Sequence, residues 1–470
     1  MTPTAGRPAH SSHRWPALAV HSVLWYRQGC YGVSACSVVL EMQVMKHFGR
    51  RSFLKGAAAL AGSAVALPYF VPSRAFGASG RLTMGAIGIG GQGMHNLRNF
   101  LTCEDLRVLA VCDVDAGHLR RAKEVVDQAY GNDSCAQYKD FREVLGRGDI
   151  DTVLIATPDH WHAILSIEAA RAGKDIYCEK PLSLTIAEGR AVADTMKRLG
   201  VVYQSGTQRR SNACFRFGVE MARSGMLGRL QTLHCYYHNG PMCPPQPAQP
   251  VPEGFDYDTW LGPAPWEPYT QARCHGSFRW HYDYSGGQLT DLGAHFNDLA
   301  QWANNSQDTG PVRYEGWAEY PKDGLFNTPV RFEVTATYAD GVKMIMHDET
   351  EPGRGPRGNK YVGDEGWVSV DDTGKVTASS EAIMRKLSGS QMGYEFMGGH
   401  HRNFLDCVKT RGVPISNAEV SHRSVTTCHA ANICLRLGRT LEWDPAAERF
   451  VNDDGANRML ARAMRSPWRL

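Results

Sequence analysis

The sequence lacks paired cysteines and lacks an excess of charge of either sign. Its 13 cysteines are scattered over 470 residues, and none stands in a Cys-x-x-Cys pair. Such spacing favours neither a zinc cage nor a disulfide framework, and we predict no metal site. The 51 Lys and Arg nearly balance the 48 Asp and Glu. Because binding to a phosphate backbone requires a basic surface, we expect no nucleic-acid partner.

Long apolar runs are also missing. The apolar stretch at residues 56–71 is shorter than the roughly 20 residues that a helix needs to span a bilayer. It follows Gly49-Arg50-Arg51-Ser52-Phe53-Leu54-Lys55, and this combination indicates a twin-arginine export signal; a lipid-anchored or buried helix is the alternative. We predict a signal peptide at 45–79, after a non-native or disordered extension at 1–44. The protein is then periplasmic or otherwise extracytoplasmic, without stable membrane insertion.

A glycine-rich turn follows this leader. An apolar segment that begins at Leu82 leads into Gly88-x-Gly90-x-x-Gly93 and a helical pattern over 94–101, and a second apolar segment ends in Asp113. Glycines let the backbone approach a pyrophosphate, and a carboxylate at Asp113 accepts hydrogen bonds from a ribose diol. A structural turn that opens a helix is the alternative. The pattern predicts a dinucleotide site formed by Gly88, Gly90, Gly91, Gln92, Gly93 and Asp113. NAD is favoured over NADP because Asp113 would repel a 2′-phosphate.

Strand and helix patterns continue to alternate as far as residue 205. Further strands are predicted at 151–156, 175–178 and 201–205, with helices at 161–172 and 185–199. This alternation is typical of a doubly wound parallel sheet, in which ligands bind beyond the carboxyl ends of the strands. Two polar turns lie at such ends. We therefore add Thr157, Pro158, His162, Glu179 and Lys180 to the predicted cofactor contacts.

These two turns carry a family resemblance. Glu179-Lys180-Pro181 after a buried strand, together with the Ala-Thr-Pro-x-x-x-His turn that ends at His162, resembles the Gfo/Idh/MocA oxidoreductases, which include glucose-fructose oxidoreductase and inositol dehydrogenase. The resemblance covers residues 82 to about 444. It implies that Lys180 is catalytic and that the bond before Pro181 is often cis. The alternative for Lys180 alone is a surface lysine in a turn.

The second half has a different pattern. Segments at 311–320, 331–338 and 342–348 favour strands in an antiparallel sheet, and the proline-rich segment 241–252 favours a long loop. The fold class is then α/β, with a Rossmann doubly wound parallel sheet and a C-terminal α+β domain that holds a large, mostly antiparallel sheet. We place the NAD-binding domain at 80–206, the substrate and oligomerisation domain at 207–445, and a C-terminal tail at 446–470.

An acidic residue and a histidine stand four residues apart in the second half. Asp291 and His295 would share one face of a helix that continues to Trp302, where the carboxylate could orient the imidazole. A surface or capping role is the alternative on spacing alone. The segment matches the family's Gly-Gly-x-Leu-x-Asp-x-x-x-His pattern. The resemblance implies that Lys180 polarises the substrate oxygen, that His295 exchanges its proton, and that Asp291 orients His295.

Several weaker candidates flank these motifs. Residues that follow the last Rossmann strand or precede the Asp/His segment could reach a sugar or could pack: Tyr203, Gln208, Arg209, Arg210, Arg279, Trp280, His281 and Tyr284. His400 and His401 are interpreted as structural.

The combined hypothesis is an NAD-dependent oxidoreductase that acts on a sugar or polyol hydroxyl by hydride transfer. Because free NAD is scarce outside the cytoplasm, the cofactor would be tightly bound and recycled in place. A redox-neutral, NAD-dependent glycoside hydrolase or lyase that works by oxidation, elimination and reduction is one alternative, and a non-catalytic sugar-binding protein is another. The family's habit of pairing open sheet faces implies a homodimer or homotetramer.

Overall fold

The computed structural model describes residues 80–348, 357–388 and 399–470. All of these residues belong to one compact unit, which extends from Tyr69 to Leu470. The predicted extension at 1–44 and the predicted signal peptide at 45–79 lie outside the described residues. Among the described helices, none is both long enough and apolar enough to cross a membrane.

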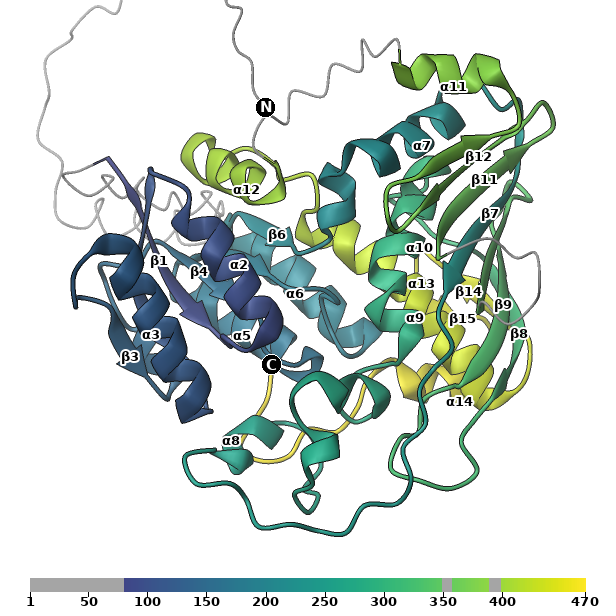
Figure 1. Ribbon diagram of the computed structural model, residues 1–470. Helices are drawn as coiled ribbons and strands as arrows, with labels where there is room; N and C mark the ends of the chain where they lie inside the picture. Colours follow the sequence, from purple (N-terminus) through teal and green to yellow (C-terminus); the bar gives the residue numbers. More distant parts are fainter. Residues whose placement is uncertain (1–79, 349–356, 389–398) are drawn as a thin grey trace, which may run out of the picture. The chain divides into compact units, whose positions relative to one another are not determined.

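A six-stranded parallel sheet forms the first part of the fold (Figure 1), as predicted. Its strand order is β3-β2-β1-β4-β5-β6, and every neighbouring pair is parallel. This is the order of a dinucleotide-binding Rossmann sheet. The strands are β1 (Leu82–Ile87), β2 (Leu106–Cys112), β3 (Ala136–Tyr138), β4 (Thr152–Ile155), β5 (Asp175–Cys178) and β6 (Tyr203–Ser205). We call residues 82–205 the parallel-sheet region.

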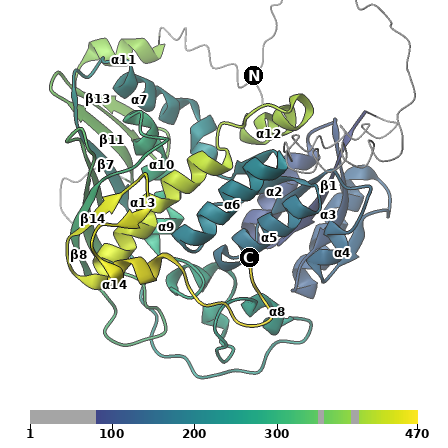
Figure 2. The same cartoon turned by 180° about the vertical axis from the view of Figure 1, so that it is seen from behind.

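Helices cover both faces of this sheet. Helix α2 lies in front of the strands in Figure 1, whereas α5 and α6 lie in front in the reverse view of Figure 2. The helices of this region are α2 (Gly91–Leu101), α3 (Ala116–Tyr130), α4 (Phe141–Leu145), α5 (Asp159–Arg171) and α6 (Ile186–Leu199). Side chains cap the starts of α3 and α6, through Asp115 and Thr185, but no side chain caps α2. The first N–H groups of α2 therefore remain available to a ligand.

The second part contains a nine-stranded sheet with the order β13-β12-β11-β7-β10-β9-β8-β14-β15. Its pairs are antiparallel except β7–β10, which confirms the predicted mostly antiparallel sheet. The strands are β7 (Leu230–Tyr237), β8 (Arg313–Glu319), β9 (Arg331–Thr337), β10 (Lys343–Asp348), β11 (Gly358–Gly363), β12 (Trp367–Asp371), β13 (Val376–Ala378), β14 (Leu441–Asp444) and β15 (Arg449–Phe450). The predicted loop at 241–252 contains no helix or strand.

Two helices, α10 and α13, pack against the nine-stranded sheet and form its core with side chains such as Phe296, Leu233 and Cys434. The helices of this part are α7 (Ala213–Arg223), α8 (Tyr257–Leu261), α9 (Gln288–Asp291), α10 (Gly293–Ala303), α11 (Glu381–Ser388), α12 (Gly399–Thr410), α13 (Ala418–Leu437) and α14 (Asp454–Asn457). Short 3-10 helices lie at Gln208–Ser211, Gln271–Arg273, His275–Trp280 and Arg458–Leu460. The helix predicted to carry both Asp291 and His295 is broken at Leu292, so each residue lies in a separate helix.

The end of the chain returns to the parallel-sheet region. Phe404 of α12 packs with Phe100 of α2 in one core cluster, and the α12 helix lies beside α2 in both views. Trp468 packs against Trp161, with ring centroids 4.6 Å apart. The segment predicted as a C-terminal tail thus includes β15 and α14 and is anchored to the fold. These contacts attach the end of the chain to helices of the parallel-sheet region.

A buried ion pair between Arg210 and Asp298 gives a stability prediction. Both side chains are almost fully buried, and Arg210 donates to the two Asp298 oxygens over 2.5 and 2.7 Å. Arg210→Ala leaves a buried carboxylate without its cation, which is expected to lower the free energy of unfolding by about 3–5 kcal/mol in denaturant titrations. Arg313→Ala is the control, because the Arg313–Glu442 pair is exposed, and its unfolding midpoint should stay near that of wild type. Equal midpoints for the two variants would contradict the prediction.

Candidate active site

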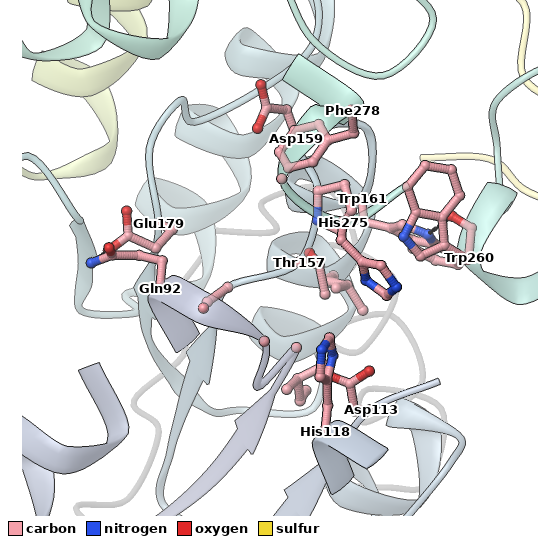
Figure 3. A pocket seen from close by; sticks show the side chains of 18 of the residues that line it. Gln92, Asp113, His118, Thr157, Asp159, Trp161, Glu179, Trp260, His275 and Phe278 are labelled. Atoms are coloured by element: carbon pink, nitrogen blue, oxygen red, sulfur yellow. Dashed lines mark hydrogen bonds and ion pairs between the residues drawn. The ribbon is translucent and has the colours of Figure 1, made fainter. Parts of the chain in front are cut away.

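A cavity of about 630 Å³ opens at the carboxyl ends of β1, β2, β4 and β5. The turns that follow these strands line one side of it, and residues 255–295 line the other. Figure 3 shows Asp113 and His118 at one end of the cavity and Asp159 and Phe278 at the opposite end. The parallel-sheet region and the second half of the chain therefore build one site together, at the edge of the sheet where such folds bind ligands.

Two glycines of the turn between β1 and α2, Gly88 and Gly93, have no room for a side chain. Gly88 has φ +78°, and a Cβ there would lie 2.7 Å from the backbone nitrogen of Thr157. A Cβ on Gly93 would lie 2.0 Å from the carbonyl oxygen of Gly88. Gly90, Gly91 and Gln92 line the cavity, where the uncapped N-terminus of α2 points. These N–H groups and the helix dipole suit the pyrophosphate of a dinucleotide, as predicted from the motif.

Asp113 occupies the end of β2, at the edge of the cavity. One of its oxygens accepts a hydrogen bond from the N–H of Ile89 over 2.7 Å, and the other accepts one from Asp115 over 2.9 Å. These bonds fix the carboxylate next to the glycine turn, while its remaining lone pairs can accept from a ribose diol. The preference for NAD over NADP stays a prediction that depends on this carboxylate.

A group of potential metal ligands lies beside Asp113. In the described part of the chain, ligand atoms of Asp115, His118 and His275 approach within 4.8 Å of one another. His118 and His275 line the cavity, and the ring nitrogen of His118 lies 3.6 Å from Asp113. The group therefore lies at the end of the cavity that also holds Asp113. No sequence pattern indicates this group, because its two histidines are far apart in the chain.

Of the residues predicted in and after the turn that follows β4, two line the cavity and one does not. Thr157 and Pro158 line it, as predicted. His162 was predicted to contact the cofactor, but it is buried outside the cavity lining. Its ring nitrogens lie 2.6 Å from the carbonyl oxygen of Pro181 and 2.8 Å from that of Thr157. His162 therefore connects the turns after β4 and β5.

Glu179 is held by amide groups at the base of the second turn. Its carboxylate accepts hydrogen bonds from Asn96 over 2.7 Å and from Gln208 over 2.8 Å, and Gln92 lies 3.4 Å away. Gly206 leaves room for it, because a Cβ there would lie 2.6 Å from the carboxylate. Figure 3 shows Glu179 beside Gln92 at the cavity wall. These bonds fix the residue that precedes Lys180.

Lys180 forms an ion pair with Asp291 across the cavity. Its ammonium also donates to the backbone carbonyl of Asp291 over 2.7 Å, and the Lys180–Pro181 bond is cis, as the resemblance implied. Arg279 donates to the same carboxylate over 3.0 Å. Burial opposes ionisation of Asp291, but Lys180 and Arg279 hold its pKa well below the usual range. Two residues that stand 111 positions apart are thus joined at one point.

His295 reaches the same cavity from α10. Its Nδ1 has no hydrogen-bond partner among the residues that the structure describes. Burial lowers the pKa of His295 well below its usual value, and the cations Arg209 and Lys180 lower it further. The predicted orientation of His295 by Asp291 is wrong, because Asp291 binds Lys180 and Arg279 instead. The lowered pKa favours the neutral imidazole, and its Nδ1 is available to a ligand in the cavity.

Some of the weaker candidate residues line the cavity and others do not. Gln208, Arg209 and Arg279 line the cavity. The remaining ones do not: Tyr203, Arg210, Trp280, His281, Tyr284, His400 and His401. His401 stacks on Tyr177 and His400 binds the carbonyl oxygen of Ser205, which agrees with their structural interpretation. Asp159 lines the cavity but was missed, because only its place after the turn at Pro158 could have indicated it.

The glycine turn after β1 and the polar turns after β4 and β5 are typical of a two-domain class of enzyme that depends on a dinucleotide. Family models agree with this class. Residues 82–207 match "Oxidoreductase family, NAD-binding Rossmann fold", and residues 243–470 match "Oxidoreductase family, C-terminal alpha/beta domain". The chain belongs to the Gfo/Idh/MocA oxidoreductase family, and its first domain is an NAD-binding Rossmann domain.

Curated relatives match shorter segments. Glycosyl hydrolase family 109 protein 2 from Shewanella sp. strain ANA-3 is 31% identical over 210 residues, which is 40% of this chain and 45% of the relative. An alpha-N-acetylgalactosaminidase from Shewanella oneidensis is 36% identical over 118 residues, which is 24% of this chain and 26% of the relative. The matched segments thus span about half of these relatives or less.

Solved structures share the fold over most of the chain. The WlbA dehydrogenase from Bordetella pertussis, solved with NADH and UDP-GlcNAcA, has a TM-score of 0.57 at 15% identity and covers 77% of this chain and 99% of its own. An aldose-aldose oxidoreductase from Caulobacter crescentus, solved with glycerol, has a TM-score of 0.56 at 18% identity, with coverage of 77% and 99%. At these identities the likeness concerns the fold.

Asp113→Asn tests the nucleotide end of the cavity. Loss of the charge should weaken binding of NAD to nucleotide-free protein by about 10- to 100-fold, because a hydrogen bond to a charged acceptor contributes about 1.5–3 kcal/mol. Binding of NADP should weaken less, since the repulsion of its 2′-phosphate also disappears. Titration calorimetry with both nucleotides measures this difference. Asp140→Asn is the control, because Asp140 lies outside the cavity lining, and unchanged NAD affinity in Asp113→Asn would refute the assignment.

Proposed function

We propose that the protein is an NAD-dependent oxidoreductase that takes a hydride from a hydroxyl-bearing carbon of a sugar or polyol. The observation that carries this proposal is the meeting of Lys180, Asp291 and His295 at the cavity that also contains the glycine cradle and Asp113. The glycine turn and the uncapped start of α2 fit the pyrophosphate, and Asp113 fits the ribose. When bound, NAD supplies the hydride acceptor.

Lys180 and His295 would divide the work on the hydroxyl group. The Lys180 ammonium, held by Asp291, donates a hydrogen bond to the substrate oxygen and stabilises negative charge on it. His295 is neutral, so its ring can accept the hydroxyl proton as the C–H bond breaks. Asp291 is a positioning residue, because its contacts are to Lys180 and Arg279. The walls of the cavity orient the carbon and exclude water.

A segment from the second half covers the nucleotide end of the cavity. The N–H of Ala116 donates to the carbonyl of Gly254 over 2.9 Å, and that of Asp256 donates to Val114 over 3.0 Å. Phe255, Trp260 and His275, which lie between and beyond these bonds, line the cavity. A nucleotide beneath this segment would leave only after these contacts part. This arrangement supports a tightly held NAD that is recycled in place.

Export through the twin-arginine route remains part of the proposal. That route carries folded proteins, so a protein with its cofactor already enclosed suits it. We also retain a homodimer or homotetramer as the expected assembly, and a periplasmic or extracytoplasmic location as the expected compartment.

The second candidate function is a redox-neutral, NAD-dependent glycoside hydrolase or lyase. The glycosyl hydrolase family 109 relatives favour it, since they share up to 36% identity with segments of this chain. In this route, oxidation to a ketone acidifies the neighbouring C–H bond and permits elimination of the aglycone, followed by addition of water. Phenol release from an aryl glycoside without net accumulation of NADH identifies this route.

Lys180→Ala tests the proposed chemistry. The variant should reduce its bound nucleotide about 100- to 10,000-fold more slowly than wild type when sugars and polyols are supplied, because the substrate oxygen loses its charged donor. NADH absorbance in single turnovers measures the rate. Mass spectrometry of the nucleotide released on denaturation should find NAD in equal amounts in both proteins.

The matched control for this experiment is Lys197→Ala, on the exposed side of α6. It should turn over like wild type. If Lys180→Ala retains its nucleotide and matches the wild-type rate, the catalytic role of Lys180 is wrong.

A further inference from the structure

Another acidic side chain of the cavity, Asp159, has no role in the hydroxyl chemistry described above. It is the first residue of α5, directly after the turn at Thr157 and Pro158, and only 4% of it is exposed. Ser285 donates a hydrogen bond to one oxygen of its carboxyl group. In Figure 3, Asp159 lies beside Phe278, at the end of the cavity far from Asp113.

The surroundings of Asp159 differ from those of Asp291. Asp291 has two cations in direct contact, whereas the one side chain bound to Asp159 is the neutral hydroxyl of Ser285. Arg279 and Lys180 act on Asp159 from a distance and favour its charged form, and Asp291 opposes them. Burial outweighs these effects and raises the pKa of Asp159 to about 7. Two carboxyl groups in one cavity thus have opposite protonation tendencies, an arrangement that suits one of them to donate a proton.

We propose that Asp159 is the general acid that protonates the leaving oxygen when this active site eliminates an aglycone from an oxidised glycoside. The proposal rests on the proposed sugar oxidation and on the redox-neutral elimination route given above as the second candidate function, and it adds a second proton-transfer group. Simple oxidation of a hydroxyl needs one base, which His295 provides. Elimination needs more, because a leaving alkoxide must also receive a proton.

After a ring carbon has been oxidised to a ketone, the neighbouring carbon loses its proton to a base, and the electron pair of that C–H bond forms a C=C bond. The C–O bond to the aglycone breaks, and its electron pair stays on the aglycone oxygen. Asp159 gives its proton to that oxygen and becomes a carboxylate. Addition of water to the C=C bond places a hydroxyl on the carbon that lost the aglycone and gives a saturated ketone. The carboxylate of Asp159 takes the proton that the water releases, and the base returns its proton to the neighbouring carbon.

The test compares leaving groups in NAD-loaded protein. Wild type, Asp159→Asn and Glu168→Gln are each given the methyl and the 4-nitrophenyl glycoside of one sugar. Glu168 is a matched control, because it lies on the same helix with 42% of its side chain exposed. Asp159→Asn should cleave the methyl glycoside at least about 100-fold more slowly than wild type. Its cleavage of the 4-nitrophenyl glycoside should fall by less than about 10-fold, because nitrophenolate leaves without an acid.

Reduction of the bound nucleotide by the same sugars is the second readout, and it should stay within about threefold of wild type in Asp159→Asn. Equal losses for both leaving groups, or a methyl-glycoside rate like that of wild type, would overturn the role of Asp159. If sugars reduce the bound nucleotide of wild type but neither glycoside is cleaved, the role of Asp159 is overturned and the proposed oxidation stands. If no sugar reduces the nucleotide, the proposed function itself is wrong.

A measurement without substrate completes the test. Infrared difference spectra near neutral pH should contain a protonated carboxyl band that is present in wild type and Glu168→Gln and absent in Asp159→Asn. A carboxyl group at position 159 that stays ionised at that pH has no proton to give, and this result also overturns the proposal.

Discussion

The ion pair between Lys180 and Asp291 is the contact on which the site depends. It joins the turn after β5 to the end of α9, and both groups are largely withdrawn from solvent. A buried carboxylate of this kind needs a cation, and Asp291 has two, Lys180 and Arg279. The pair therefore fixes the direction of the Lys180 side chain and leaves a positive excess beside the substrate end of the cavity. A positioned cation of this kind is what a developing alkoxide requires.

The rest of the fold holds the two halves of this contact in place. His162 connects the turns after β4 and β5, and amide donors fix Glu179 beside Lys180. On the other side, Asn432 of α13 donates to the carbonyl of Gly286 over 2.9 Å and so anchors the segment that leads into α9. The buried Arg210–Asp298 pair links the end of the parallel sheet to α10, from which His295 projects. Polar contacts within each half of the chain thus hold the two partners of the ion pair in place.

Much of this arrangement could be predicted from the sequence. The buried strands, the glycine turn and Asp113 each have a local sequence pattern. Together these patterns predict a Rossmann sheet and the position of its nucleotide site. Lys180 follows a strand whose end the same patterns locate. The relation of Asp291 to His295 could not be predicted by spacing, because the helix breaks at Leu292 and a distant lysine competes for the carboxylate. The direction of His162 and the presence of Asp159 in the cavity likewise depend on packing between segments far apart in the chain. Such contacts leave no periodic signal.

A crystal structure of the protein with NAD and a sugar bound tests the central claim most directly. The account predicts that the nicotinamide ring lies between the Glu179–Lys180 turn and α10, with a sugar hydroxyl about 3 Å from the Lys180 ammonium and within reach of His295. It also predicts that the adenosine end lies against Asp113. A nicotinamide ring bound at the Asp113 end, or a sugar hydroxyl far from both Lys180 and His295, would contradict it.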